Sequence, residues 1–347
     1  MEIKKYFEAA LKQGASDLHL IADDPPVLRV NGGLVIIEEK PLAAAELQTA
    51  IFSLLDKKEA EAFQKEKELD LAWDLVGSHF RVNLHLQSGK IGLAARIIPA
   101  EIPSAKEVNF DETVYRLSHL NQGLILVTGP SGSGKSTTLA VLINLINQER
   151  KAHIITIEDP IEFIFKEKQS VIEQREVGRD TNSFSEALKR ALRQDPNVIM
   201  VGEMRDPETI SATLTAAETG HLVLSTLHTN SAAETIERIV DIFPAHRQHQ
   251  ILTQLASVLR AVVSQQLVPQ KGGGVIMARE ILINTPGIAN LMREGKTIQI
   301  NSAIQTGRKD GMITMASCLK DLYEQGLIDR QVYLNRTGSG ETLSTYY

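Results

Sequence analysis

A glycine-rich segment, GPSGSGKST over residues 129–137, constrains the fold of this chain more than any other feature. It follows the apolar run Leu124–Thr128 and precedes a stretch with helical character, Thr137–Asn147. Glycines in such a loop let successive backbone N–H groups curl around phosphate at a helix N-terminus. The lysine neutralises β- and γ-phosphate charge, and the hydroxyl binds magnesium. The segment therefore predicts a P-loop that binds ATP and Mg²⁺.

The expected contacts of this loop are shared between two side chains and the surrounding backbone. Lys135 is expected at the phosphates and Ser136 at Mg²⁺. The other predicted nucleotide-binding residues are Ser131, Gly132, Ser133, Gly134 and Thr137. The alternative, a glycine-rich turn without a ligand, is remote because strand, loop and helix follow in the order that the motif requires.

Uniformly apolar runs alternate with helical stretches from about Val114 onward, which indicates an α/β fold. The runs are Leu124–Thr128, His153–Ile157, Val198–Val201 and Leu222–Leu227. Strands that are apolar throughout are typical of a parallel sheet covered by helices on both faces. Beyond Pro244 the chain is expected to be largely helical, because Ile251–Leu267 is apolar at helical spacing.

The first hundred residues predict a separate α+β unit. Residues 80–86 alternate apolar and polar side chains, which is the period of a strand with one face in water. Arg81 is on the polar side of this alternation and is expected to point away from the core of its unit. A second strand, Ile91–Ile98, carries Arg96 near its end, and Asn31–Gly32 predicts a hairpin turn.

The predicted domain boundaries follow these changes in pattern. We expect an N-terminal domain over residues 1–100, a linker over 101–113 and a core over 114–270. A helical C-terminal region over 271–334 and a flexible tail over 335–347 would follow. The length of 347 residues agrees with about two domains of roughly 150 residues each.

Composition limits the class of protein. Hydrophobic residues make up 43% and charged residues 23%, as in soluble globular proteins. The apolar runs stop short of the roughly 20 residues that a membrane span requires, so we expect a cytoplasmic protein. A net charge of -6 argues against nucleic acid as the main partner. Cys318, the single cysteine, excludes an internal disulfide and a cysteine-based zinc site.

Candidate catalytic groups follow the other predicted strands. Glu203 comes directly after Val198–Gly202 and is the candidate base for the attacking water, with a surface ion pair as the alternative. Glu158 ends another strand in an acidic cluster that suits magnesium or water positioning, or else helix capping. His228 ends a third strand and is a candidate sensor of the γ-phosphate, because phosphate sites lie at the carboxyl ends of strands. Arg205 either joins this site or pairs with a nearby carboxylate.

Six segments together resemble the secretion and type IV pilus ATPases, in particular the pilus retraction (twitching motility) branch. They are GASDLHL at 14–20, HFRVN at 79–83, GPSGSGKSTTLA at 129–140, ITIEDPIEF at 155–163, ALRQDPNVIMVGEMRD at 191–206 and HLVLSTLHTNSAAETIERIVDIFP at 221–244. The resemblance runs nearly from end to end. It implies a RecA-like P-loop ATPase core with a smaller PAS-like N-terminal domain.

The resemblance also implies roles for individual residues. Glu203 would be the catalytic glutamate, Glu158 part of the acidic box and His228 part of the histidine box. Arg81 and Arg96 match N-terminal arginines that reach the γ-phosphate in the family. Without the resemblance, a solvent-facing residue without a catalytic role would be the better interpretation of an isolated arginine on a strand. The resemblance makes the catalytic role the better interpretation for Arg81 and Arg96.

The resemblance further implies partners and a place of action. A homo-hexamer would hydrolyse ATP to drive pilus retraction on an inner-membrane pilus platform protein. It would lie in the cytoplasm, associate with the inner membrane only peripherally, and act alone or beside a paralogous pilus ATPase.

Two features of the sequence separate the branches of the family. Extension and type II secretion ATPases usually carry a tetracysteine zinc insertion, which Cys318 alone cannot build. Retraction ATPases carry a C-terminal segment resembling AIRNLIRE, and residues 287–294 read GIANLMRE. Ala289 departs from this motif, which leaves an accessory retraction ATPase as an alternative. Extension or type II secretion is a further alternative, and a RecA-like nucleic-acid motor is the alternative from another class.

Overall fold

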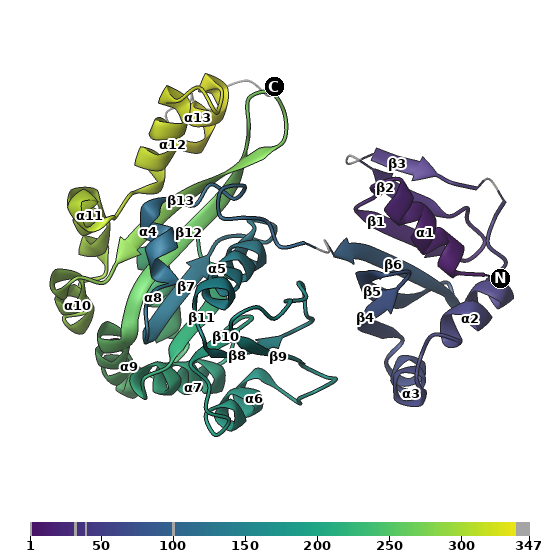
Figure 1. The fold of residues 1–347 in the computed structure, drawn as a ribbon, viewed down its shortest axis with the longest axis horizontal. Helices are drawn as coiled ribbons and strands as arrows, with labels where there is room; N and C mark the ends of the chain where they lie inside the picture. The colour runs from purple at the N-terminus through teal and green to yellow at the C-terminus, as the bar shows by residue number, and fades with distance from the viewer. Residues whose placement is uncertain (1, 31–32, 39, 99–100, 338–347) are drawn as a thin grey trace. The chain divides into compact units, whose positions relative to one another are not determined.

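The computed structural model describes residues 2–30, 33–38, 40–98 and 101–337. The chain divides into two compact units: one comprises the chain up to residue 101 with residues 160–164, and the other comprises residues 102–159 and the chain from 165 onward. The predicted hairpin turn at Asn31–Gly32 and residues 338–347 of the predicted tail lie outside the described residues. Figure 1 shows the elements of each unit.

The N-terminal unit is built on a six-stranded antiparallel sheet in the order β3-β2-β1-β6-β5-β4. Its elements are α1 (Lys4–Lys12), β1 (Asp17–Ile21), β2 (Val27–Val30), β3 (Gly33–Ile36), α2 (Ala44–Phe52), α3 (Lys57–Glu66), β4 (Glu68–Leu75), β5 (Ser78–Gln87) and β6 (Lys90–Ile98). Phe7 of α1 packs edge-on against Phe80 of β5, with 4.9 Å between ring centroids. Apolar side chains on one face of the sheet thus form the core of this unit.

The alternation predicted for residues 80–86 is present in β5, with one exception. Phe80, Val82 and Leu84 are fully buried, while Arg81 lies on the opposite face. Leu86 is 39% exposed. The buried apolar face of β5 therefore ends at Leu84.

The second unit is built on a seven-stranded sheet in the order β13-β12-β7-β11-β10-β8-β9. Its strands are β7 (Gly123–Thr128), β8 (His153–Glu158), β9 (Val171–Glu176), β10 (Val198–Val201), β11 (Leu222–Leu227), β12 (Leu259–Pro269) and β13 (Val275–Ile283). All neighbours are parallel except β12 and β13. The four strands predicted from apolar runs are confirmed, and they place their carboxyl ends at one edge of the sheet.

Helices cover the strands of this sheet, which is why β7 and β11 are buried at every position. The helices are α4 (Glu112–Leu117), α5 (Lys135–Glu149), α6 (Phe184–Ala191), α7 (Pro207–Glu218), α8 (Ala232–Asp241), α9 (Ala245–Val258), α10 (Pro286–Arg293), α11 (Ile298–Thr306), α12 (Met315–Glu324) and α13 (Arg330–Thr337). Both α5 and α7 pack on β7 and β11. The predicted α/β fold is confirmed. Among the described residues, no helix combines the length and the apolar character that crossing a bilayer requires.

The helix predicted over Ile251–Leu267 is wrong in its second half. Helix α9 ends at Val258 and the chain continues as strand β12, which pairs with β7 on one side and β13 on the other. A short apolar run is compatible with a helix or with a buried strand, and pairing with two neighbours decides for the strand. The region from residue 271 is therefore not all helical, because β13 belongs to the central sheet. In the predicted tail, residues 335–337 are the last turn of α13.

The predicted linker is fixed to the second unit in its later half. Arg279 of β13 is 3% exposed, and its guanidinium donates to the carbonyls of Val108 (2.6 Å) and Asn109 (2.5 Å). The same guanidinium stacks over the ring of Phe110. Burial lowers the pKa of Arg279 to about 10.

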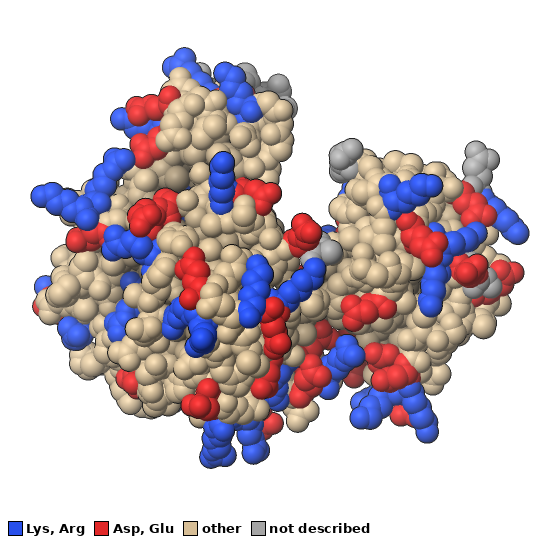
Figure 2. Space-filling view, viewed as in Figure 1, with Lys and Arg blue, Asp and Glu red and all other residues tan. Residues whose placement is uncertain are grey.

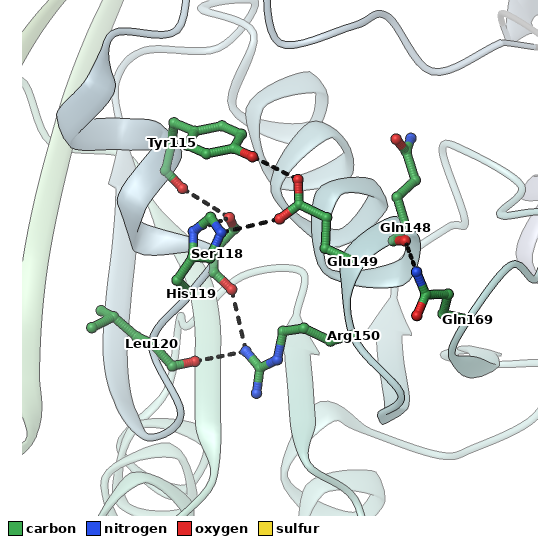
Figure 3. Close-up of polar contacts among 8 residues, drawn as sticks. All are labelled: Tyr115, Ser118, His119, Leu120, Gln148, Glu149, Arg150 and Gln169. Carbon is green, nitrogen blue, oxygen red and sulfur yellow. Dashed lines mark hydrogen bonds and ion pairs between the residues drawn. The ribbon is translucent and has the colours of Figure 1, made fainter.

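The far end of α5 is also anchored (Figure 3). The hydroxyl of Tyr115 donates to the carboxylate of Glu149 (2.6 Å). Arg150, directly after the helix, donates to the carbonyls of Ser118 (3.2 Å) and Leu120 (2.7 Å). These bonds fix the C-terminal end of α5 to the segment that leads into β7, while the glycine-rich loop fixes its N-terminal end.

Candidate nucleotide site

The loop between β7 and α5 has the backbone of a phosphate cradle. Gly129, Gly132 and Gly134 adopt φ values of 146°, 75° and 84°, which are favourable only for glycine. A Cβ on Gly129 would lie 2.4 Å from the backbone oxygen of Gln265 and 2.6 Å from Oγ of Ser133. The loop is therefore closely packed and leads directly into the N-terminus of α5.

Lys135 and Ser136 begin that helix, two residues before the predicted start at Thr137. Lys135 is 8% exposed, and its Nζ donates to the carbonyls of Gly129 (2.9 Å) and Pro130 (3.1 Å). Oγ of Ser133 is buried and has no hydrogen-bond partner among the described residues. An ammonium group, an orphaned hydroxyl and a helix N-terminus at one loop fit the binding of nucleotide phosphate.

The end of β10 holds Glu203 between two neighbouring strands. The N–H of Gly202 donates to the carbonyl of Ile157 on β8 (2.8 Å), and the hydroxyl of Thr226 on β11 donates to the carbonyl of Gly202 (2.7 Å). The side chain of Glu203 is 16% exposed. A mostly buried carboxylate on a fixed backbone suits a catalytic base.

His228 connects Glu203 to the P-loop lysine. Nε2 of His228 lies 3.6 Å from Oε2 of Glu203, and Nδ1 of His228 lies 3.5 Å from Nζ of Lys135. On its other side, the same carboxylate oxygen accepts from Nε of Arg205 (2.7 Å). Burial and the nearby Lys135 ammonium lower the pKa of His228, which favours a neutral imidazole.

The question that the sequence left open for Arg205 is thereby answered. It pairs with Glu203, whereas the carboxylate of Asp206 accepts from the N–H and the hydroxyl of Thr209 and caps α7. A cavity of about 450 Å³ borders this group. Arg238 of α8 joins Glu203, Arg205 and His228 in its lining.

Glu158 lies at the end of β8, on the same sheet edge but farther from the P-loop. Strand β10 separates β8 from β11, and β11 in turn separates β10 from β7. The Glu158 carboxylate is 6% exposed and accepts from Thr156 (2.7 Å) and Gln174 (3.3 Å). Its position suits support of the site from the side, away from the contacts that join Lys135, His228 and Glu203.

Arg81 and Arg96 are direct neighbours in the N-terminal unit. They are Cα partners across β5 and β6, so their side chains share the face opposite the core. Nε of Arg96 donates to Asp17 of β1 (2.9 Å), and the Arg96 side chain is 68% exposed. The two arginines thus lie side by side on this sheet face, with Asp17 paired to Arg96.

Sequence reasoning missed two residues of β12 that contact the P-loop or the residue just before it. Gln265 of β12 donates to the carbonyl of Ser133 (2.8 Å) and accepts from the hydroxyl of Thr138 (2.9 Å). Ser264, its neighbour, contacts Thr128 at the end of β7 (2.8 Å). Ser264 and Gln265 stand out in the sequence as polar residues inside an apolar run. Because that run was predicted to be a helix, their position beside the P-loop could not be inferred.

A P-loop after an inner strand of a mostly parallel sheet, with a mostly buried glutamate at the end of another strand, defines a RecA-like P-loop ATPase. Residues 1–280 match the model of one family, described as Type II/IV secretion system protein. The chain belongs to this family.

Individual relatives narrow the similarity. The chain is 48% identical to the type IV pilus retraction ATPase PilT of Pseudomonas aeruginosa over 95% of this chain and 96% of that protein. It is 37% identical to the type IV pilus ATPase PilU of the same organism, over 99% of this chain and 90% of that protein. A crystal structure of the pilus retraction motor PilT with bound ADP has a TM-score of 0.90 and 45% identity, covering 96% of both chains. The chain is similar to pilus retraction ATPases over nearly its whole length.

Proposed function

We propose that this chain is the ATP-hydrolysing motor subunit that drives type IV pilus retraction. The observation that carries the proposal is the similarity to a retraction ATPase over nearly the whole of both chains, at 48% identity. The contacts among Lys135, His228 and Glu203 support it, because they join a phosphate-binding lysine to a buried carboxylate.

Each group has a role that its position supports. Lys135 would bind the β- and γ-phosphates, and Ser136 would hold Mg²⁺, which neutralises developing charge on those phosphates. Glu203 would accept the proton of the attacking water, while Arg205 fixes its carboxylate (2.7 Å). His228 lies between Glu203 and Lys135 and would sense the γ-phosphate through Lys135. Glu158 would position water or Mg²⁺ from the end of β8.

Arg81 and Arg96 would complete the site by stabilising transition-state charge on the γ-phosphate. Their shared sheet face supports this, because both guanidinium groups are presented on the side away from the core. Their action would couple hydrolysis to movement of the N-terminal domain, which we place at residues 1–100, joined by a linker over 101–113.

We propose a homo-hexamer that acts on an inner-membrane pilus platform protein from the cytoplasm, by peripheral association with the membrane. The relatives support a pilus system as the setting of this work. A paralogous pilus ATPase would act beside it.

The accessory role remains the second candidate because of Ala289. Ala289 lies on the buried side of α10 and is 7% exposed, whereas the retraction motif has an arginine at this position. The greater identity to PilT (48%) than to PilU (37%) favours the main motor. For a nucleic-acid motor the surface offers little support: on the face in Figure 2, basic and acidic side chains are interspersed rather than gathered into a basic stripe.

Deletion of the gene tests the proposal. Loss of the retraction motor should leave cells with excess surface pili and no twitching, because pili extend and are not withdrawn. Electron microscopy and a twitching assay measure both properties. Cells without pili would instead assign the protein to extension, and unchanged piliation and twitching would assign it an accessory role.

A further inference from the structure

Gln265 is a buried polar residue at the point where the P-loop begins. Strand β12 pairs with β7 as far as Ser264 and Thr128, so Gln265 lies one residue beyond the last pair, beside Gly129. Its side chain is 1% exposed. Buried amides are retained where both of their ends are hydrogen-bonded, so the partners of Gln265 indicate what it does.

Both ends of the Gln265 amide bind the phosphate-binding segment. Nε2 donates to the carbonyl of Ser133, the residue before Gly134 (2.8 Å). Oε1 accepts from the hydroxyl of Thr138 in the first turn of α5 (2.9 Å). One planar group therefore spans the junction where loop becomes helix, and sets the angle between them.

That junction determines where the phosphate-binding N–H groups point. Gly134 adopts φ 84° between the two bonded residues, a conformation that only glycine adopts readily. Without a bridge, this permissive residue would let the end of the loop rotate relative to α5. The amide supplies a donor and an acceptor at once, which neither a carboxylate nor an aliphatic side chain does.

We propose that Gln265 is a positioning residue for the nucleotide: its amide holds the last turn of the P-loop against the first turn of α5, so that the backbone N–H groups converge on phosphate. The inference rests on the proposed ATPase function of this loop. Gln265 touches the loop and the helix, and acts on the nucleotide through them.

Two substitutions in the full-length protein test this role. In Gln265→Leu both bonds are lost, and the Kd for ADP, measured by calorimetry, should rise about tenfold or more because the loop is misplaced. In Gln265→Glu the carboxylate cannot donate to Ser133, whereas its protonated form can; burial raises the pKa of a carboxyl group, so the protonated fraction grows as the pH is lowered from 8 to 6. The ratio of the variant's Kd to that of the wild type should therefore fall as the pH is lowered. A purely structural role predicts no such change.

The matched control is Gln266→Leu, at the next position of the strand. Its Kd for ADP should lie within about twofold of the wild-type value, a difference of only about 0.4 kcal/mol. Circular dichroism establishes which variants are folded. If Gln265→Leu does not fold, Thr138→Val removes one bond alone and should still raise the Kd severalfold. Wild-type Kd values in folded Gln265→Glu at pH 8 and in Thr138→Val would overturn the role of Gln265, with the ATPase proposal intact. No ADP binding by the wild type would overturn both.

Discussion

At the scale of single residues, the site depends on how the Glu203 carboxylate is held. Arg205 (2.7 Å) and His228 (3.6 Å) meet the same oxygen, and the lowered pKa of His228 favours a neutral ring there. Arg205 therefore supplies the cation that pairs with the Glu203 carboxylate. An ionised carboxylate is the form that accepts a proton from water.

Substitution of the two candidate glutamates separates their roles. Glu203→Gln should bind ATP but hydrolyse it at least about 100-fold more slowly than the wild type, because the amide cannot accept the proton. Glu158→Gln, the matched control, should retain more activity. Steady-state phosphate release measures both rates. Wild-type turnover in Glu203→Gln together with loss of turnover in Glu158→Gln would exchange the two roles.

The residues of the site were predictable where a motif or a strand end marks them. Lys135 and Ser136 are named by their loop, and Glu203 and His228 by the strands they follow. The pairing of Arg205 with Glu203 was not predictable, because Asp206 and Glu208 also lie within three residues of Arg205. Capping of α7 by Asp206 engages one of these competitors, which the sequence alone does not show.

At the scale of elements, β12 shows why part of the fold could not be predicted. Its sequence, LRAVVSQQLVP, is apolar enough for a buried helix, and only pairing between β7 and β13 makes it a strand. The four core strands that were predicted are short apolar runs that alternate with helical stretches, a pattern typical of a parallel sheet. Long-range pairing thus determined what local pattern could not.

Arg279 of β13 connects this sheet to the linker, and its removal should be costly. Arg279→Met leaves the carbonyls of Val108 and Asn109 without their buried donor. We expect the free energy of unfolding, measured by urea denaturation, to fall by about 2–4 kcal/mol. Arg308→Met, at a side chain that is 73% exposed, is the matched control and should change it by less than about 1 kcal/mol. Equal effects of the two substitutions would contradict the anchoring role of Arg279.

At the scale of the whole molecule, two units with separate cores carry the residues to which we assign catalytic roles. The P-loop and Glu203 belong to one unit, and Arg81 and Arg96 to the other. A motor needs chemistry in one unit to be felt by the other. Arginines that contact the γ-phosphate would supply that coupling.

Arg81→Ala tests this coupling. The variant should assemble as the wild type does. It should hydrolyse ATP at least about tenfold more slowly, because the negative charge of the transition state loses a positively charged partner. Size-exclusion chromatography and phosphate release measure assembly and rate. Lys58→Ala, at an exposed cation on α3 of the same unit, should leave the rate unchanged. An unchanged hydrolysis rate in Arg81→Ala would show that Arg81 is a solvent-facing strand residue without a role in catalysis.

The claim that ATP hydrolysis at Glu203 drives retraction is tested most directly by complementation of the deletion strain. Wild-type protein should restore twitching and normal piliation, whereas Glu203→Gln, produced at the same level, should leave the cells hyperpiliated and unable to twitch. Full restoration of twitching by Glu203→Gln would contradict the account.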